Sequence, residues 1–224
     1  MAELPPMGTV AAIYRSYETS QRKEWFGALG MSSFGDECDR KLWYGWRRAS
    51  SAEQIDGRKA RLFETGTREE DRLVADLRRA GLTVFERDAE TGKQFKVSDF
   101  GGHLSGRLDG KVVDVPEAPL AWHVLEAKTH NEKSFKDLVK KGVEVAKPGH
   151  FAQMQLYMHY EGAFDRALYI AANKNDESIY VERVKYEGGK ALAIVARAER
   201  ILRSQGTPAR LHEDPSAKAA FACA

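Results

Sequence analysis

The feature that most constrains the fold is a stretch in which acidic residues interrupt two strand-like runs. It extends from His103 to His130, reads HLSGRLDGKVVDVPEAPLAWHVLEAKTH, and contains a Pro-Glu-Ala-Pro break. Each run carries one acid, Asp109 or Glu126, where a buried strand would normally have an apolar residue. A fold that builds a sheet from these runs must supply a partner for both carboxylates or leave them in water.

The Pro-Glu-Ala-Pro break predicts a hairpin with a defined register. If the break closes a hairpin, its midpoint lies between Glu117 and Ala118, and Asp109 lies directly opposite Glu126. Side chains alternate across a strand, so Lys128 shares the face of Glu126. The pattern therefore predicts two carboxylates and an ammonium close together.

Paired carboxylates on a rigid sheet are typical ligands of a hard divalent cation such as Mg²⁺ or Mn²⁺. The alternative is that Glu126 and Lys128 form a surface ion pair on an edge strand. An acid-x-Lys triplet is common by chance, and the sequence also has one at Asp39 and one at Asp109. Only the triplet at Glu126 follows an apolar run, Trp-His-Val-Leu, which distinguishes it from the other two; on the hairpin alone, the metal site and the surface ion pair both stay open.

A third acid stands out in a helix expected over residues 58–80. Its apolar stripe is formed by Leu62, Phe63, Gly66, Leu73, Val74 and Leu77. Glu70 falls on this stripe, whereas Glu69 and Asp71 are expected to point outward. Because a buried acid is costly without a partner, we expect Glu70 to bind a metal; the alternatives are that it reaches water at the margin or pairs with an arginine.

The remaining pattern predicts one domain with appendages. The chain has 224 residues, 42% of them hydrophobic, which is enough for one sizeable core. We expect a weakly patterned segment at 1–30, with a helix over Ile13 to Phe26, then a domain at 31–205 and a tail at 206–224. Within the domain, the runs between residues 82 and 130 predict four successive, mostly antiparallel strands. Helices are expected at 132–141, after Pro148 and at 189–204, with strands at 166–173 and 178–187.

Charge and cysteine content limit the partners and the compartment. The net charge is only +2, so contacts with nucleic acid must come from local clusters of Lys and Arg. The helix at 132–141 is rich in lysine, which is typical of a solvated face but also of a surface that guides phosphates. The sequence has no apolar run of the roughly 18 residues that span a bilayer and no signal-peptide layout, so we expect a cytoplasmic protein. Its two cysteines do not indicate a disulfide framework, which agrees with a reducing compartment.

Four motifs in chain order carry a family resemblance. They are Glu70 in a helix, Asp109 on a strand, Glu126-Ala127-Lys128 on the next strand, and Gln153-x-x-x-Tyr157 on a following helix. The set resembles the PD-(D/E)XK nuclease superfamily, and within it the RecB-like branch of phage exonucleases and CRISPR-adaptation exonucleases. The resemblance covers roughly residues 31–205 and implies an α/β restriction-endonuclease-like core, in which a mixed central β-sheet is flanked by helices.

The resemblance implies a metal-dependent deoxyribonuclease that acts from DNA ends. The implied metal ligands are Glu70, Asp109, Glu126 and the backbone carbonyl of Ala127, with Lys128 assisting the attacking water or stabilising charge. Gln153 and Tyr157 are the DNA contacts that the resemblance implies. Arg40, Lys133 and Lys136 are expected DNA contacts from their basic surroundings alone, with an amphipathic helix that covers the core as the favoured alternative for the segment with Arg40. For Gln153 and Tyr157, orientation of the carboxylates and simple core packing stay open as alternatives. The setting implied is the cytoplasm of a bacterium or of a phage-infected cell, and oligomer formation is compatible with it.

Two features depart from the family pattern. Many members have His where this chain has Glu70. Several members also bind a four-iron cluster through one early cysteine, in a context like that of Cys38, and three late ones; here only Cys38 and Cys223 are present. An iron–sulfur cluster is therefore expected only if the natural chain continues past Ala224. The alternative functions are a catalytically inactive nuclease-like DNA-binding or interaction module, and a structural protein whose acids form salt bridges.

Overall fold

The structure is a computed structural model that describes residues 8–20, 27–49, 55–214, 216–217 and 222–223. In chain order its elements are α1 (Gly8–Ser20), β1 (Leu29–Gly30), the 3₁₀ helix η1 (Met31–Gly35), α2 (Asp39–Arg47), α3 (Gly57–Arg79), β2 (Thr83–Phe85), β3 (Lys96–Asp99), the 3₁₀ helix η2 (Phe100–Gly102), β4 (Leu104–Arg107), β5 (Gly110–Val113), β6 (His123–His130), α4 (Glu132–Ala146), α5 (Pro148–Glu161), β7 (Arg166–Asn173), β8 (Ile179–Lys185) and α6 (Gly188–Arg203).

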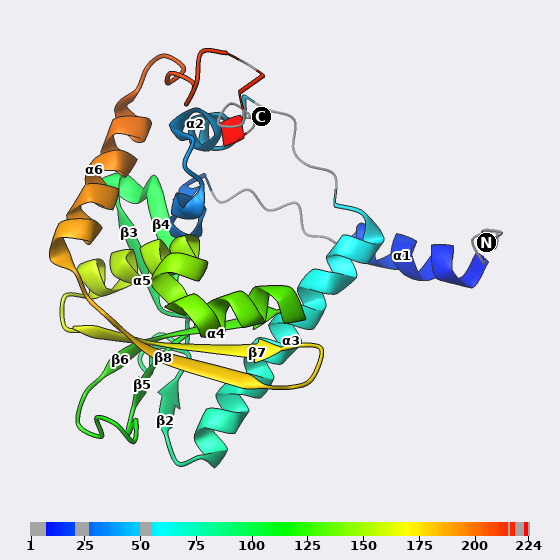
Figure 1. Cartoon of the computed structure of the whole chain (residues 1–224), viewed down its shortest axis with the longest axis vertical. Coiled ribbons are helices and arrows are strands. Elements are labelled where there is room, and N and C mark those ends of the chain that lie inside the picture. The colour runs from blue at the N-terminus through cyan, green and yellow to red at the C-terminus, as the bar shows by residue number, and fades with distance from the viewer. Residues whose placement is uncertain (1–7, 21–26, 50–54, 215, 218–221, 224) are drawn as a thin grey trace.

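A five-stranded sheet forms the centre of the fold, in the order β2-β5-β6-β7-β8. Strands β6 and β7 are parallel and the other neighbours are antiparallel, so the sheet is mixed. Helix α3 packs on one face through Leu73, Val74 and Leu77, and α4 and α5 lie on the opposite side (Figure 1). The expected α/β architecture, a mixed sheet flanked by helices, is confirmed.

The predicted hairpin is present in the predicted register. Gly110 pairs with Leu125, Lys111 with Val124 and Val112 with His123. These pairs are symmetric about the point between Glu117 and Ala118, which confirms the midpoint inferred from the proline break. Extending the register by one residue places Asp109 opposite Glu126.

The first strand of the predicted hairpin is in fact two strands, β4 and β5, so the expectation of four strands between residues 82 and 130 is wrong. Strand β4 belongs to a second sheet, in the order β1-β4-β3, and β5 belongs to the central sheet. The chain crosses between the sheets at Leu108, which is fully buried and donates its N–H to the carbonyl of Phe95 at 3.1 Å. Next to the crossing, the carbonyl of Arg107 accepts a hydrogen bond from the Tyr157 hydroxyl at 2.7 Å. Gly106 permits this approach, because a Cβ there would lie 2.4 Å from the Tyr157 ring.

Helix α3 matches the predicted helix, but its stripe is buried only in the second half. Leu73, Val74 and Leu77 are buried, whereas Leu62 is 46% and Phe63 is 49% exposed. The first half of α3 extends beyond the central sheet beside α1 (Figure 1), so it has no core to face. Helix α1 begins earlier than expected, at Gly8, and residues 21–26 of its predicted span lie outside the described residues.

The later elements lie within a few residues of their predicted positions. Helix α4 continues past its predicted end through a kink at Gly142, where φ is 74°. The kink frees the N–H of Val143, which donates to Glu182 Oε2 at 2.8 Å. Strands β7 and β8 and helices α5 and α6 all match their predicted segments.

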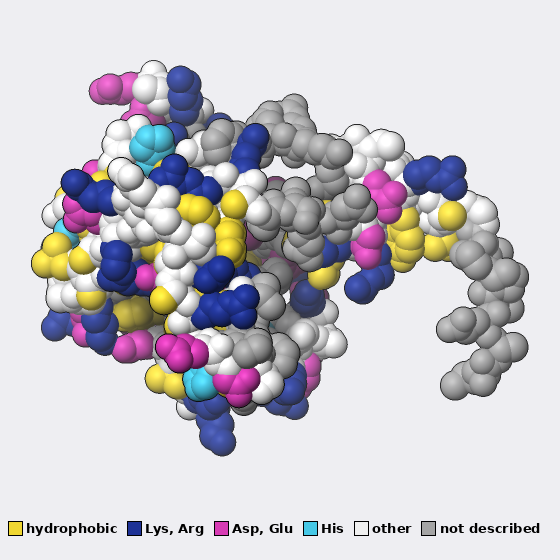
Figure 2. Space-filling view, turned by 90° about the horizontal axis from the view of Figure 1, so that it is seen from above, with side chains coloured by type: hydrophobic (Ala, Val, Ile, Leu, Met, Phe, Trp, Pro, Cys, Tyr) yellow, Lys and Arg dark blue, Asp and Glu magenta, His cyan; other side chains and the backbone are white. Residues whose placement is uncertain are grey.

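The two cysteines form a disulfide, contrary to the expectation that they would not pair. Cys38 precedes α2, Cys223 lies near the C-terminus, and their Cα atoms are 5.3 Å apart across 185 residues. A separation of that length gives no sign of proximity in the sequence. Figure 2 shows basic and acidic side chains intermixed over the face on which α2 lies, in keeping with the small net charge. Within the described ranges, no helix combines the length and apolarity needed to cross a membrane.

Candidate active site

The candidate site lies where β5 separates from β6. The ladder between them ends at Gly110 and Leu125. One step further, the N–H of Ala127 donates to Asp109 Oδ2 at 2.9 Å, so a carboxylate replaces the strand as hydrogen-bond acceptor. The end of the ladder therefore leaves an opening between these two inner strands of the sheet.

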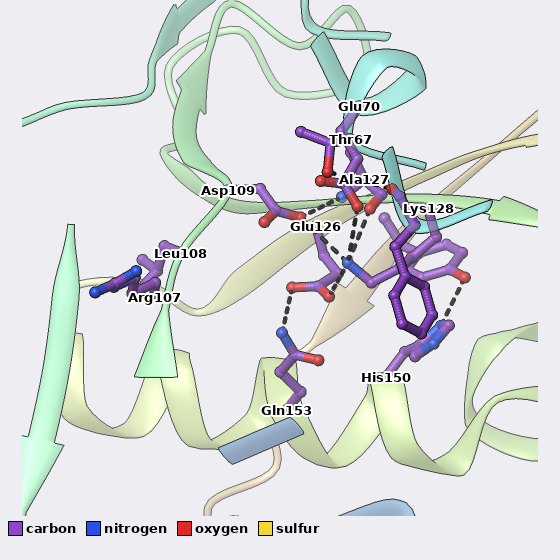
Figure 3. A network of polar contacts seen from close by, with 12 residues as sticks. Thr67, Glu70, Arg107, Leu108, Asp109, Glu126, Ala127, Lys128, His150 and Gln153 are labelled. Carbon is purple, nitrogen blue, oxygen red and sulfur yellow. Dashed lines mark hydrogen bonds and ion pairs between the residues drawn. The ribbon is translucent and has the colours of Figure 1, made fainter. Parts of the chain in front are cut away.

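Lys128 lies at the centre of the side chains that gather in this opening (Figure 3). Its Nζ atom is 2.7 Å from Glu126 Oε1, 3.4 Å from Asp109 Oδ2 and 4.0 Å from Glu70 Oε1. It also donates to the carbonyl of Ala127 at 2.9 Å. We call Glu70, Asp109, Glu126 and Lys128 the acidic cluster.

The acidic cluster carries more negative than positive charge in a poorly solvated place. Glu126 is fully buried, and this burial raises the pKa of its carboxyl, with Asp109 adding to the rise and Lys128 opposing it. Partial burial likewise raises the pKa of Glu70, again opposed by Lys128. Burial would lower the pKa of Lys128, but the carboxylates of Glu126 and Asp109 outweigh it and raise that pKa. One ammonium is thus shared by three carboxylates.

A hydrogen-bonded chain from α5 fixes the orientation of Glu126. Gln153 Nε2 donates to Glu126 Oε2 at 3.1 Å and to the Tyr157 hydroxyl at 2.9 Å, and Tyr157 donates to the carbonyl of Arg107. Gln153 is 7% and Tyr157 only 2% exposed. The structure therefore gives no support to direct DNA contact by this pair and places both behind the carboxylate, which was the alternative role inferred from their spacing.

Glu70 reaches the cluster from α3, on the other side of the sheet. Its side chain is 37% exposed, so it lies at the margin of the helix stripe rather than in the core. Glu69 is directed elsewhere and pairs with Arg72 at 3.3 Å. Asp71 is exposed, as the helix pattern predicted, and it also lines the cavity beside Glu70, from the middle of α3.

A cavity of about 250 Å³ opens beside the cluster. Its lining includes Glu70, Asp71, Glu86, Arg87, Asp109 and Ala127. Four of these side chains are carboxylates, and the Ala127 backbone contributes to the wall. The cavity is therefore strongly acidic, with oxygen atoms as its dominant polar groups.

The donor types of the acidic cluster fit a hard divalent cation. All three acids offer oxygen, which Mg²⁺ and Mn²⁺ prefer, and the surplus negative charge calls for a cation. The buried Oε1 of Glu126 receives no well-formed hydrogen bond from the described residues, although Lys128 Nζ is close. Among these residues, no three His, Cys, Asp or Glu side chains form a ready cage, because Lys128 Nζ lies between the acids. The ammonium thus stands where positive charge is needed.

Two histidines beside the site were not singled out from the sequence. His130 Nε2 lies 2.8 Å and His150 Nδ1 lies 2.9 Å from the hydroxyl of Tyr169. Burial lowers the pKa of His130 to about 4 and that of His150 to about 3, with nearby Lys128 and Lys147 adding to the effect. The signal was available in the sequence, since His130 shares the strand face of Lys128 and His150 lies one turn before Gln153. Both histidines are therefore neutral near pH 7, and their rings stack on each other beside the cluster.

The other predicted contact residues lie away from the cluster. Arg40, on α2, donates to the Tyr44 hydroxyl at 2.9 Å and to the carbonyl of Pro208 at 3.4 Å, so the C-terminal segment holds it. Lys133 and Lys136 lie along a groove on α4, which begins directly after β6, and Lys136 pairs with Glu132 at 2.5 Å.

The cysteines predicted as cluster ligands lie together but are bonded to each other. The disulfide between Cys38 and Cys223 includes both cysteines of the sequence. An iron–sulfur cluster needs thiolate ligands, and a disulfide supplies none. The observed arrangement therefore does not fit such a cluster.

Comparison with solved structures shows that the fold is shared with known proteins. An alkaline exonuclease (LHK-Exo) from Laribacter hongkongensis superimposes with a TM-score of 0.56 at 15% identity, over 84% of this chain and 90% of that chain. The same protein in complex with dAMP gives 0.55 at 15% identity, over 86% and 90%. The protein SSO0001 gives 0.51 at 16% identity, over 89% and 88%. No protein-family profile matches the sequence, and no curated protein matches it either.

Proposed function

We propose that this chain is a metal-dependent DNA nuclease of the PD-(D/E)XK type that removes nucleotides from DNA ends. The observation that carries the proposal is the convergence of Glu70, Asp109 and Glu126 on Lys128 where β5 and β6 separate. A fold shared with an alkaline exonuclease supports the same reaction class. A purely structural role fits less well, because one ammonium leaves the three carboxylates short of positive charge.

Glu70, Asp109, Glu126 and the carbonyl of Ala127 would hold Mg²⁺ or Mn²⁺. When bound, such an ion supplies a Lewis acid for the phosphate and makes water acidic enough to attack near neutral pH. Asp109 also fixes the Ala127 peptide through its N–H, so the carbonyl of Ala127 faces the same opening.

The protein's own side chains position the reacting groups. Lys128 keeps an ammonium beside the phosphate site, and its field stabilises negative charge that develops during attack. Gln153 holds Glu126 in one rotamer through its amide, and Tyr157 in turn holds Gln153. The acids therefore need little rearrangement when substrate arrives.

The lysine groove on α4 supports a path for the phosphate backbone. Because α4 begins directly after β6, Lys133 and Lys136 extend from the strand that carries Glu126 and Lys128. Electrostatic contacts of this kind hold DNA without reading its sequence.

A degradation assay tests the proposed function. Linear DNA and covalently closed circles of one sequence are incubated with the protein in Mg²⁺, in Mn²⁺ and in EDTA. We expect loss of the linear DNA only with metal, while the circles persist. A Glu126→Gln protein prepared in the same way controls for contaminating nucleases.

The other outcomes separate the alternatives. Cutting of closed circles at the same enzyme dose indicates an endonuclease. DNA binding without degradation in any metal indicates a catalytically inactive DNA-binding module. If the protein neither binds nor degrades DNA, the assignment to DNA is overturned.

A further inference from the structure

The cavity beside the acidic cluster is electrostatically unfavourable for a phosphate. Glu70, Asp71, Glu86 and Asp109 all line it. Glu86 is neutralised by Arg78 at 2.8 Å, but Asp71 has no ion-pair partner among the described residues. A DNA phosphate that enters the cavity needs a basic side chain of the protein in addition to the divalent cation that the acids would bind.

Lys128 does not offer a free hydrogen-bond donor to that phosphate. A lysine ammonium has three donors. In this structure the ammonium donates to Asp109 at 3.4 Å and to the carbonyl of Ala127 at 2.9 Å, and it forms an ion pair with Glu126 at 2.7 Å. Lys128 is also absent from the described residues that line the cavity. Lys128 therefore acts on the substrate through its electrostatic field rather than through a direct hydrogen bond.

Arg87 is the one basic side chain among the described residues that line this cavity. It is exposed and lies in the turn between β2 and β3. Its NH1 group donates to the carbonyl of Gly92 at 3.2 Å, which anchors one corner of the guanidinium. Its other donors have no partner among the described residues. An arginine fork presented in this way suits the oxygens of a phosphate.

The turn that carries Arg87 is held rigidly. Arg87 pairs with Gln94 across the turn, and Asp88 Oδ1 accepts hydrogen bonds from the N–H and the hydroxyl of Thr91 at 2.8 and 2.9 Å. Gln94 Nε2 donates to the carbonyl of Leu108 at 3.0 Å, the residue directly before Asp109. The turn is thus fastened to the strand segment that delivers a site carboxylate.

We propose that Arg87 binds the DNA phosphate that is presented to the acidic cluster. This inference rests on the proposed nuclease function and adds to it a substrate-binding residue outside the four motifs recognised in the sequence. The guanidinium makes the direct contact to phosphate oxygens that Lys128, with its donors occupied, does not make. Positive charge is then supplied from the side of the cavity opposite α3.

The test compares Arg87→Gln with Lys93→Gln. Both changes remove one positive charge from the same turn, but Lys93 is exposed and does not line the cavity. Binding of a short duplex is followed by fluorescence anisotropy with Ca²⁺, with a gel to verify that the strands stay intact, over a series of salt concentrations. Single-turnover cleavage is followed with Mg²⁺ at subsaturating DNA.

We expect Arg87→Gln to weaken binding and slow cleavage roughly tenfold or more, and Lys93→Gln to change either by less than about twofold. The slope of log affinity against log salt should fall by about one for Arg87→Gln alone. Equal effects of the two variants overturn the inference. If Arg87→Gln does not fold, Arg87→Lys replaces it; this variant keeps the charge but loses the fork, and a rate equal to that of Lys93→Gln then overturns the inference.

Failure of the proposed function gives a different result. If the wild-type protein binds DNA but never cleaves it, the nuclease assignment fails and the anisotropy comparison still decides the role of Arg87. If the wild-type protein does not bind DNA, both proposals fail together.

Discussion

Two ionic clusters in this protein have opposite ratios of acidic to basic side chains. In the acidic cluster, three carboxylates share Lys128. At the start of α2, the single carboxylate of Asp39 is held by Arg197 at 2.6 Å and by Arg200 at 2.7 Å. Arg197 also donates to the carbonyl of Asp36 at 2.6 Å. We call Asp39, Arg197 and Arg200 the arginine clamp.

The difference appears in the protonation of the acids. Burial alone would raise the pKa of Asp39, but hydrogen bonds from Arg200 and Arg197 outweigh it and hold the pKa below its ordinary value. In the acidic cluster, burial prevails and raises the pKa of Glu126 and Glu70. The arginine clamp is complete within the protein, whereas the acidic cluster lacks positive charge. A deficit of this kind identifies a binding site better than the mere presence of charged residues.

The largest expected contrast is in activity. Glu126→Gln should reduce cleavage by about 10³-fold, because under the proposed function it removes a metal ligand worth several kcal/mol in the transition state. The free energy of unfolding should hold or rise, since repulsion among the acids is relieved. Steady-state cleavage and thermal unfolding of the same preparation measure the two effects. Cleavage at the wild-type rate by folded Glu126→Gln protein contradicts the assignment.

The arginine clamp should respond in the opposite way. Asp39→Asn should lower the free energy of unfolding by about 2 kcal/mol, because two arginines lose a charged partner that is only partly screened by solvent. Cleavage per folded molecule should stay at the wild-type level. Urea denaturation and the linear-DNA assay give the two values. A large loss of activity at full stability would place this clamp in the functional machinery and end the contrast.

His130 and His150 give the stability of the protein a pH dependence of their own. The pKa values of His130 and His150 are about 4 and about 3, below the ordinary 6.5, so the unfolded chain binds more protons between pH 6.5 and 4. The contribution of these two histidines to stability therefore falls as the pH drops through that range, whereas the raised pKa values of Glu126 and Glu70 act in the opposite direction. His150→Gln should make the fall between pH 7 and 5 smaller by about 1–2 kcal/mol.

The control for this effect is Asp39→Asn, which should leave the slope unchanged. The lowered pKa of Asp39 means that its contribution is lost only below about pH 3.8. Urea denaturation at each pH measures the slope. An unchanged slope in His150→Gln would show that this histidine titrates normally in the folded protein.

The smallest expected effect sharpens the boundary of the acidic cluster. Glu70→Gln should weaken Mn²⁺ binding roughly tenfold, or about 1.4 kcal/mol, because a half-exposed ligand loses its charge. Glu69→Gln, on the same helix turn but paired with Arg72, should leave the affinity unchanged. Calorimetric titration of Mn²⁺ into each variant makes the comparison. Equal weakening by the two changes, or by neither, would remove Glu70 from the ligand set.

Much of the fold and the acidic cluster could be predicted from the sequence because their signals are local. The proline break fixed the register that sets Asp109 opposite Glu126, and helix periodicity set Glu70 apart. The arginine clamp gave no such signal, since Asp39 and its arginines lie at opposite ends of the chain. The crossing at Leu108 was missed for a related reason. A continuous strand and a strand that changes sheets have the same alternation, and only the contact of Tyr157 with the Arg107 carbonyl separates them.

The crossing at Leu108 bears on how the protein can vary over generations. The chain passes from the second sheet to the central sheet at Leu108, directly before Asp109, so the position of Asp109 depends on how the two sheets are packed. A change in β3 or β4 that shifts one sheet slightly against the other alters the core that the two sheets share and also displaces Asp109. Under the proposed nuclease function, such changes are expected to reduce activity before they unfold the protein. The second sheet should drift slowly in sequence, although the site motifs all lie outside it.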